Sequence, residues 1–299
     1  MSDIITKNLF PTFLFKRLSE DYGKETAEEI ARGSYGRAVT LRANALKSDR
    51  QLVKAALTEA GIRTLDVPWY GDALILPDVR ENAVRNLKIY SEGHIYLQSL
   101  SSMLPPLFLS PKAGENILDM TAAPGGKTAQ LLALSGGAAQ ITACEKDKLR
   151  FERMKHNLAL QGAGRVNCLC TDALKLSDFL RFDKILLDAP CSGSGTLDLR
   201  APLSISEKLI DNCAKLQEQL LIKALKMLKS GGELVYSTCS VLKCENENVL
   251  DRVFAKTGAE LIPVAPFPGL PLLPSAEGTV CLRPTELYEG FFVAKIKKR

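Results

Sequence analysis

Apolar residues in the first part of the chain change from helical to strand-like spacing. Between residues 10 and 32 they recur three or four apart, which predicts a helical segment that Gly23 divides in two. Alternation at 38–42 predicts a strand, and residues 49–61 predict a helix capped by Asp49. Two more short strands are expected at 64–67 and 73–76. Residues 1–90 are therefore predicted to hold a helical segment followed by a small α+β domain.

From residue 91 onward, short apolar runs alternate with amphipathic segments. The runs that predict strands are 116–120, 140–145, 166–170, 184–188, 233–237 and 290–296. The segments that predict helices are 127–134, 148–160 and 206–228. This alternation is typical of βαβ units, so residues 91–299 are predicted to form an α/β domain with a mostly parallel sheet. Six of the 15 prolines lie between Pro263 and Pro284, where a long loop is expected.

Composition excludes several classes of protein. Of the 299 residues, 46% are hydrophobic and 24% are charged, which is a globular balance and not that of a disordered or fibrous chain. The formal net charge of +5 permits a nucleic-acid partner without requiring one. The start of the chain does not read as a signal peptide, and no apolar run approaches the roughly 20 residues of a membrane helix. We expect a cytoplasmic monomer with no membrane partner.

The eight cysteines are the unusual part of the composition. With two histidines and no Cys-x-x-Cys pair, the chain is expected to hold no metal. In a reducing cytoplasm the thiols stay free, and most should be small buried hydrophobes. Alternation along strands can place Cys144, Cys168 and Cys170 in the core, whereas Cys213 and Cys244 need only helix packing or exposure.

The loop after the first strand of the α/β domain has the composition of a ligand-binding loop. It reads Asp119-Met120-Thr121-Ala122-Ala123-Pro124-Gly125-Gly126-Lys127-Thr128. Small residues and paired glycines let a ligand approach the backbone where a helix begins. The spacing is not that of a phosphate loop, Gly-x4-Gly-Lys-Ser/Thr, because Thr121 stands in place of the first glycine. A P-loop ATPase is therefore disfavoured.

Acidic residues follow the next two strands. Glu145 ends the second strand, 26 residues after Asp119, where a carboxylate can accept both hydroxyls of a ribose. Asp172 follows the third strand and can accept a hydrogen bond from an adenine amino group. Since ligands of open α/β sheets bind beyond the carboxyl ends of the strands, the three acids imply an adenosine. Without a phosphate loop, S-adenosylmethionine fits better than ATP.

Two cysteines lie just past the fourth and fifth strands. The fourth strand runs into Asp188-Ala189-Pro190-Cys191-Ser192-Gly193, and the fifth into Tyr236-Ser237-Thr238-Cys239-Ser240. Both thiols should therefore reach the same crevice as the acids. Inert packing is hard to reconcile with Cys191, because the adjacent proline and glycines place it on a loop.

These motifs resemble the Sun family of RNA cytosine-5 methyltransferases. The resemblance rests on Asp-x-x-Ala-Ala-Pro-Gly-Gly-Lys-Thr, Asp-Ala-Pro-Cys-Ser-Gly and Ser-Thr-Cys-Ser, and it extends to residues 41–47, 98–103 and 290–294. It implies a Rossmann-like class I methyltransferase domain with a mostly parallel seven-stranded sheet and a small RNA-recognition-like domain. It also implies methyl transfer from S-adenosylmethionine to carbon 5 of a cytosine in RNA, with ribosomal RNA favoured over transfer RNA.

The resemblance further implies a role for each matching residue. Cys239 would be the nucleophile, Cys191 would assist product release, and Asp188 would hold the cytosine ring nitrogen while also facing the cofactor. The residues implied at the amino-acid end of the cofactor are Thr121, Ala122, Ala123, Pro124, Gly125, Gly126 and Lys127, with Lys127 near the reaction centre. Glu145 would take the ribose and Asp172 the adenine.

The chain departs from the family pattern in three places. Thr121 stands where many members have cysteine, residues 197–202 are a reduced form of an arginine-rich stretch, and Arg283-Pro284-Thr285 lacks a histidine often found there. The last two segments would flank RNA in a family-like fold. Basic residues expected to contact RNA phosphates are Arg42, Lys47 and those of the terminal segment 295–299, although a solvated tail also explains that segment.

Two other functions fit parts of this pattern. One is a methyltransferase for exocyclic amines, proteins or small molecules, a class that usually carries Asn/Asp-Pro-Pro-Tyr in place of Asp-Ala-Pro-Cys. The other is a non-catalytic ribosome-assembly factor, which would have no need of Cys191, Cys239 and Asp188 together. Methyl transfer to unmodified RNA separates both from the leading hypothesis.

Overall fold

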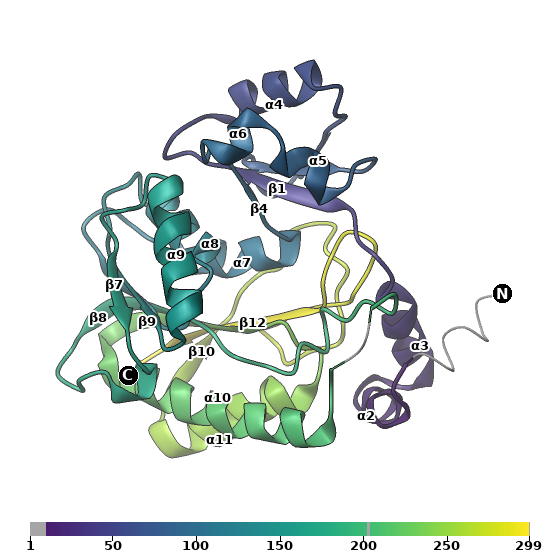
Figure 1. The fold of residues 1–299 in the computed structure, drawn as a ribbon. Helices are drawn as coiled ribbons and strands as arrows, with labels where there is room; N and C mark the ends of the chain where they lie inside the picture. The colour runs from purple at the N-terminus through teal and green to yellow at the C-terminus, as the bar shows by residue number, and fades with distance from the viewer. Residues whose placement is uncertain (1–9, 202–203, 299) are drawn as a thin grey trace.

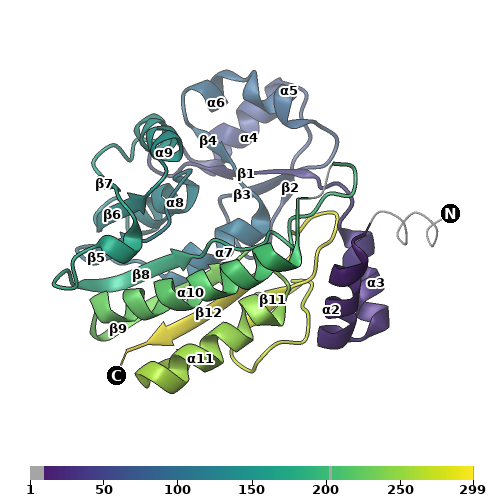
Figure 2. The same cartoon turned by 60° about the horizontal axis from the view of Figure 1, so that its bottom comes forward.

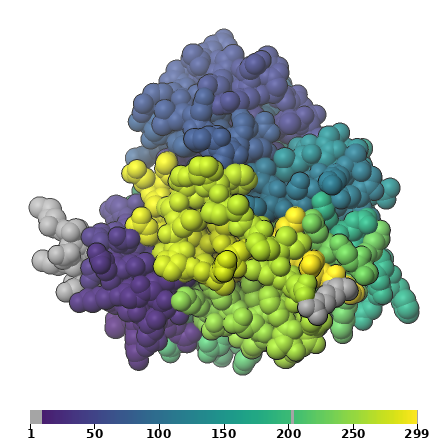
Figure 3. Space-filling view, turned by 180° about the vertical axis from the view of Figure 1, so that it is seen from behind, coloured from purple at the N-terminus to yellow at the C-terminus, as the bar shows by residue number. Residues whose placement is uncertain are grey.

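The computed structural model describes residues 10–201 and 204–298 and builds them around two sheets. The chain begins with α2 (Thr12–Tyr22) and α3 (Lys24–Gly33), separated as predicted by Gly23. Their apolar residues Leu14, Leu18 and Ile30 are fully buried within the core of the larger sheet. Figure 3 shows both helices (purple) against the C-terminal part of the chain (yellow-green), away from the small domain (blue).

The small domain is an antiparallel sheet with three helices. Its strands are β1 (Val39–Ala43), β2 (Leu65–Asp66), β3 (Ala73–Leu76) and β4 (Ile95–Leu97), in the order β2-β3-β1-β4. Its helices are α4 (Arg50–Glu59), α5 (Glu81–Arg85) and α6 (Lys88–Ser91). As predicted, Asp49 caps α4, because its carboxylate accepts from the amides of Gln51 and Leu52. Apolar side chains of β1, β3 and α4 form a separate core.

Two contacts bear on the limits of the expected N-terminal unit, residues 1–90, of which 1–9 lie outside the described residues. The strand β4 follows residue 90 but pairs with β1, so the small sheet continues past that boundary. The helices α2 and α3 pack with the larger sheet and not with the small one, since their buried leucines belong to its core. We propose that the N-terminal domain is the small sheet with its three helices, and that α2 and α3 belong to the larger domain.

The larger sheet is mostly parallel. Its strands are β5 (Asn116–Asp119), β6 (Gln140–Glu145), β7 (Asn167–Cys170), β8 (Phe182–Asp188), β9 (Leu228–Thr238), β10 (Glu260–Ile262), β11 (Val280–Leu282) and β12 (Phe291–Lys297). The order is β10-β12-β9-β8-β5-β6-β7, with β11 also paired to β12. The five strands from β7 to β9 are parallel, whereas β10, β11 and β12 pair antiparallel. Seven strands form the expected path, and β11 adds an eighth inside the proline-rich segment expected as a loop.

Helices cover both faces of this sheet (Figures 1 and 2). The bounds are α7 (Leu100–Leu109), α8 (Gly126–Leu134), α9 (Lys148–Leu160), α10 (Glu207–Met227) and α11 (Glu247–Thr257), with short 3-10 turns η1 (Ala173–Lys175) and η2 (Lys243–Glu245). Alternate residues of β8 enter different cores: Ile185 and Leu187 pack with α10 and α11, whereas Leu186 packs with α7, α8 and α9. This is the three-layer arrangement expected for the α/β domain. No helix of the described part of the chain is long and apolar enough to cross a membrane.

Candidate active site

The loop between β5 and α8 forms one wall of the site, and its two glycines have different uses. Gly125 has a φ of 100°, a left-handed conformation that residues with a side chain rarely adopt. A Cβ placed on Gly126 would lie 2.4 Å from a ring atom of Tyr96 in β4. Contact with the small domain therefore requires glycine at position 126.

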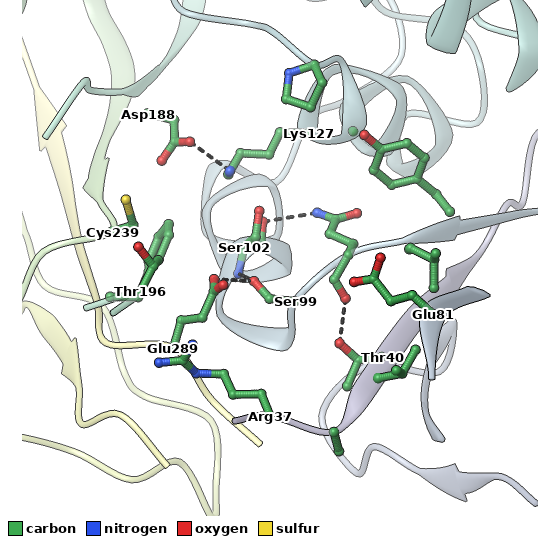
Figure 4. A pocket seen from close by; sticks show the side chains of 18 of the residues that line it. Arg37, Thr40, Glu81, Ser99, Ser102, Lys127, Asp188, Thr196, Cys239 and Glu289 are labelled. Atoms are coloured by element: carbon green, nitrogen blue, oxygen red, sulfur yellow. Dashed lines mark hydrogen bonds and ion pairs between the residues drawn. The ribbon is translucent and has the colours of Figure 1, made fainter. Parts of the chain in front are cut away.

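An ion pair joins this loop to the end of β8. Lys127 Nζ lies 2.7 Å from Asp188 Oδ2 (Figure 4). Ser237 Oγ donates to the other carboxylate oxygen at 2.7 Å. Thr121 Oγ1 donates to the Asp188 carbonyl at 2.8 Å. Burial alone would lower the pKa of Lys127, but the charge and hydrogen bond of Asp188, aided by Asp119, raise it above its usual value. The ammonium group therefore stays charged.

The two cysteines meet in space. Cys191, three residues beyond β8, and Cys239, directly after β9, place their Sγ atoms 3.0 Å apart. The Gly195 amide donates to the Cys239 carbonyl at 3.0 Å, which joins the two loops. The hydrogen bond to Cys239, together with burial, raises the pKa of Cys191 well above that of a free thiol.

Two cavities share a wall that contains Cys239. The larger, about 830 Å³, lies between the small domain and the strand ends, and the smaller, about 220 Å³, extends over β6 and β7. Four residues line both cavities: Thr121, Ala123, Asp188 and Cys239. The smaller cavity also contains Cys191. This arrangement gives each of two reactants its own space, with a thiol and a carboxylate at the boundary.

The acids after β6 and β7 line the smaller cavity. Glu145 is 6% exposed, accepts from the Asp147 amide at 2.9 Å and lies 3.5 Å from Arg150 Nη1. Asp172 accepts from the Leu174 amide at 3.0 Å and so also caps η1. The structure brings these two carboxylates together with Ala123, as the adenosine hypothesis requires.

The third acid, Asp119, lies elsewhere. It borders the larger cleft, is 1% exposed and accepts from Thr128 Oγ1 at 2.7 Å. Burial raises the pKa of this carboxyl to about 6 despite the hydrogen bond. Four residues of the predicted cofactor loop also border the larger cleft and not the smaller cavity: Ala122, Pro124, Gly126 and Lys127.

The larger cleft contains polar residues that sequence reasoning did not single out. Glu289 accepts from Ser99 Oγ at 2.5 Å, and both side chains face the cleft in Figure 4. Arg37 donates to the carbonyl groups of Gly195 and Leu197, and burial lowers its pKa. Thr196, Asp198 and Arg200 border the same cleft, while residue 202 lies outside the described residues; that residues 197–202 flank RNA stays a prediction. The likeness of 98–103 and 290–294 to the family, and the expectation for residues 197–202, pointed to this region but not to Arg37 or Glu289.

One of the expected RNA contacts is wrong. Arg42 is completely buried and donates to Gln98, Gln161 and the Gly126 carbonyl, so it cannot reach a phosphate. In the terminal segment, β12 runs antiparallel to β9, and Lys295 and Lys297 form ion pairs with Glu233 and Glu260. This end of β12 lies at the opposite edge of the sheet from Cys239, and a contact of the terminal segment with RNA stays a prediction. Residue 299 lies outside the described residues.

The core prediction for three cysteines holds only for Cys144, which is buried. Cys168 is half-buried and Cys170 is exposed. The reason is that β7 ends the strand order, so its side chains have a neighbouring strand on one side only. Lys47 is exposed, as a phosphate contact requires, and its ammonium group contacts two carbonyl groups of the chain.

Comparison with known families gives two matches. Residues 106–297 match the model described as 16S rRNA methyltransferase RsmB/F, and residues 10–81 match the ferredoxin-like domain of RsmF/B-like methyltransferases. The first match covers the whole larger sheet, and the second covers α2, α3 and most of the small domain. The N-terminal domain is therefore a ferredoxin-like α+β domain, and the C-terminal domain is Rossmann-like with a mixed, mostly parallel sheet.

Curated relatives include enzymes for different RNAs. The chain is 33% identical to a 28S rRNA (cytosine-C(5))-methyltransferase of Mus musculus, over 99% of this chain and 40% of that protein. It is 36% identical to Ribosomal RNA small subunit methyltransferase F of Shewanella piezotolerans, over 87% and 57%. It is 32% identical to a tRNA (cytosine(72)-C(5))-methyltransferase of Pyrococcus horikoshii, over 92% and 74%. The chain thus spans about half the length of the first two relatives.

A solved structure is similar over nearly the full length of both chains. The crystal structure of NSun6 from Pyrococcus horikoshii with SFG, an analogue of S-adenosylmethionine, has a TM-score of 0.89 and 25% identity, covering 97% of this chain and 98% of that one. With the family match over residues 106–297 and the relatives above 30% identity, this shows the family. The chain belongs to the RsmB/F family of S-adenosylmethionine-dependent RNA methyltransferases.

Proposed function

We propose that this chain transfers a methyl group from S-adenosylmethionine to carbon 5 of a cytosine in RNA, through a covalent adduct of Cys239 with carbon 6. The observation that carries the proposal is the position of Cys239. Its Sγ atom lies 3.0 Å from that of Cys191, on the wall shared by the two cavities. A base in the larger cleft and a cofactor in the smaller cavity would meet there.

The donor set of the smaller cavity fits S-adenosylmethionine. Its carboxylates, Glu145 and Asp172, suit ribose hydroxyls and an adenine amino group, and Ala123 offers an apolar surface between strand ends. Thr121 and the following backbone would hold the amino-acid end. When bound, the cofactor supplies the methyl group as a sulfonium electrophile. Asp188, which faces both cavities, would contact cofactor and base.

Cytosine needs the thiol because carbon 5 is a poor nucleophile. Addition of the Cys239 thiolate to carbon 6 places the electron pair on the carbon 5 side of the ring and makes carbon 5 nucleophilic. A carboxyl group at ring nitrogen 3 stabilises this adduct, and Asp188 lies within the same cleft. Lys127, held by Asp188 at 2.7 Å, keeps a positive charge near the thiol and favours its ionisation.

The adduct must then be released. After methylation a base removes the proton on carbon 5, the carbon 5–carbon 6 double bond forms, and the carbon–sulfur electron pair returns to Cys239. We propose that Cys191 assists this step, because its thiol lies within hydrogen-bond distance of the departing sulfur. The target base has to leave its stack to enter the cleft, so an unpaired or flipped cytosine is the expected substrate.

The test is methyl transfer to purified unmodified RNA, with the product nucleoside identified by mass spectrometry. Wild-type protein should form 5-methylcytidine, Cys239→Ser should form none, and Cys213→Ser, which changes a buried thiol of α10, should keep activity. An active Cys239→Ser enzyme contradicts the proposal. Methylation of an exocyclic amine, or binding of RNA without methylation, would favour the alternative classes.

We further propose ribosomal RNA as the substrate over transfer RNA. Two of the three relatives described above are ribosomal RNA enzymes by name, and the third is a transfer RNA enzyme by name. This majority supports ribosomal RNA as the substrate. Parallel assays with bulk ribosomal and transfer RNA from cells that lack the protein decide it. A preference for transfer RNA would overturn this part only. The cytoplasmic location and the monomeric state stay predictions.

A further inference from the structure

Glu245 is a buried charge that the proposed chemistry does not use. It ends η2, is 0% exposed and borders neither cavity. Among the residues that the structure describes, no lysine or arginine forms an ion pair with it. A buried carboxylate without a cation is costly unless several hydrogen bonds stabilise its charge.

Those hydrogen bonds come from the two cysteine loops. The Ser192 amide donates to Oε1 at 2.8 Å, and Gln217 Nε2 donates to the same atom at 3.3 Å. The hydroxyl groups of Ser192 and Ser240 both donate to Oε2 at 2.6 Å. Ser192 follows Cys191 and Ser240 follows Cys239, so one carboxylate joins the two backbone segments that carry the thiols.

A second set of contacts shows that the junction is rigid. Ser194 Oγ and Ser240 Oγ lie 2.8 Å apart, and Gln217 also donates to the Pro190 carbonyl at 2.9 Å. The amide of Val241 donates to Ser194 Oγ at 3.1 Å. Gln217 Oε1 has no hydrogen-bond partner, but the other contacts of this buried network join both cysteine loops to η2 and α10 and restrain their positions.

We propose that Glu245 is a positioning residue that holds the two cysteines in register and keeps the proton of the thiol pair on Cys191, so that Cys239 is the member that ionises. The proposal rests on the function proposed above. Two thiolates 3.0 Å apart repel strongly, so the pair carries at most one negative charge in its working state. The location of that charge decides which sulfur attacks.

The charged groups around the pair are unevenly placed. Glu245 from η2 accepts from the Ser192 amide, directly after Cys191, and from the Ser240 hydroxyl after Cys239. Lys127 from α8 borders the larger cleft together with Cys239 and not with Cys191, and it is paired with Asp188 at the end of β8. The hydrogen bond to Cys239, burial, and the charges of Cys239 and Glu245 all raise the pKa of Cys191. The other titratable groups that face the pair are Cys213 of α10 and Tyr236 of β9, and the pKa of each is raised too, mainly by burial.

Glu245→Gln removes the negative charge of the side chain while it can keep the hydrogen bonds to the two cysteine loops. Oε1 accepts from two N–H groups, which can only donate, so the amide oxygen of the new glutamine should occupy this position. The amide nitrogen then takes the place of Oε2 and donates to the hydroxyl groups of Ser192 and Ser240, which can rotate to accept. The variant should therefore fold with the junction intact and without its negative charge.

The readout is the initial rate of iodoacetamide alkylation at each cysteine between pH 7 and 10, followed by peptide mass spectrometry at low extent of modification. In wild-type protein the Cys239 rate should level off at a lower pH than the Cys191 rate. In Glu245→Gln the Cys191 rate at pH 8.5 should rise about tenfold, because removal of the negative charge of Glu245 lowers the pKa of the Cys191 thiol. Cys239 should change less.

Glu247→Gln is the matched control. Glu247 is also buried, but its carboxylate accepts from Ser275 and contacts neither cysteine loop. An unchanged Cys191 rate in folded Glu245→Gln, or an equal rise in Glu247→Gln, overturns the proposal. If Glu245→Gln does not fold, the wild-type order still decides, because ionisation of Cys191 before Cys239 also overturns it.

Methylation assays on the same samples keep the two proposals apart. Glu245→Ala, which loses charge and hydrogen bonds, should lower kcat at least about tenfold while KM for RNA stays at the wild-type value, since Glu245 borders neither cavity. Wild-type kcat in this variant contradicts the positioning role. Failure of wild-type protein to methylate any RNA contradicts the proposed function, whereas the alkylation rates still report on Glu245.

Discussion

Replacing Arg42 by methionine should open the interface between the two domains. Arg42 in β1 is completely buried, and the described part of the chain offers its guanidinium no carboxylate within ion-pair distance. It donates to Gln98 Oε1 at 3.1 Å, and to the Gly126 carbonyl and Gln161 Oε1 at 3.3 Å each. It thereby joins the small domain to the start of α8 and the end of α9.

The magnitude follows from these bonds and from the cost of burial. Three hydrogen bonds from a charged donor contribute on the order of 1.5 kcal/mol each at these lengths. Desolvation offsets part of this sum: burial lowers the pKa of Arg42, and its Nη1 atom has no hydrogen-bond partner. Methionine fills most of the volume but leaves three acceptors unsatisfied, so the free energy of unfolding should fall by about 3 kcal/mol.

Trp69 makes the assay specific to the interface. It is the one tryptophan of the chain, its Nε1 donates to the Tyr288 hydroxyl at 3.0 Å, and its ring stacks on Phe267 at 5.6 Å. Urea unfolding followed by tryptophan fluorescence and by far-ultraviolet circular dichroism should show the fluorescence transition moving first in the variant.

Arg63→Met is the control, because Arg63 lies in the same domain and its side chain is 63% exposed. That substitution should change the unfolding free energy by less than about 0.5 kcal/mol. The reasoning is refuted if Arg42→Met is as stable as Arg63→Met, or if the fluorescence and circular dichroism transitions of Arg42→Met coincide.

Three further substitutions test individual contacts. Asp119→Asn should remove a pH dependence of stability. The Asp119 carboxyl loses its proton near pH 3.8 in the unfolded chain and near pH 6 in the folded one, so the free energy of unfolding of the wild type should fall by about 3 kcal/mol as the pH rises between these values. Denaturant titrations of the variant should lack this fall. Gly126→Ala should lower the free energy of unfolding by about 1–3 kcal/mol, because its Cβ would lie 2.4 Å from the Tyr96 ring. Gly164→Ala, whose Cβ would have no atom nearer than 3.8 Å, should leave stability unchanged, and equal melting temperatures of the two variants would contradict the clash. Leu14→Ala should lower the free energy of unfolding by about 2–5 kcal/mol if α2 belongs to the core of the larger domain. Leu52 is 63% exposed, so Leu52→Ala should change it little, and an equally stable Leu14→Ala would contradict the assignment of α2 to that core.

Elements with a clear period were predictable from the sequence, and elements without one were not. The strand at 140–145 and the helix at 148–160 have the predicted bounds, since each combines regular spacing with a clear end. The strand β11 was missed because three apolar residues between prolines are too short to show a period. The paired cysteines were found because parallel strands end at one edge.

The buried polar residues were not predictable in the same way. Arg42 reads as a surface cation within an alternating strand, yet the small domain turns it toward α8. Glu245 lies in a polar stretch that reads as solvated, and its partner Ser192 is 53 residues away. Contacts of that separation depend on the packing of whole elements, which local patterns do not encode.

Covalent trapping of RNA tests the central claim most directly. Cys191→Ser should release the product slowly and accumulate the covalent adduct. The variant is incubated with unmodified RNA and S-adenosylmethionine, digested with nuclease and analysed by peptide mass spectrometry. The peptide that contains Cys239 should then carry a methylated cytosine nucleotide. The double variant with Cys239→Ser should carry none. An RNA adduct on any other residue, or methylation by Cys239→Ser without an adduct, would contradict the account.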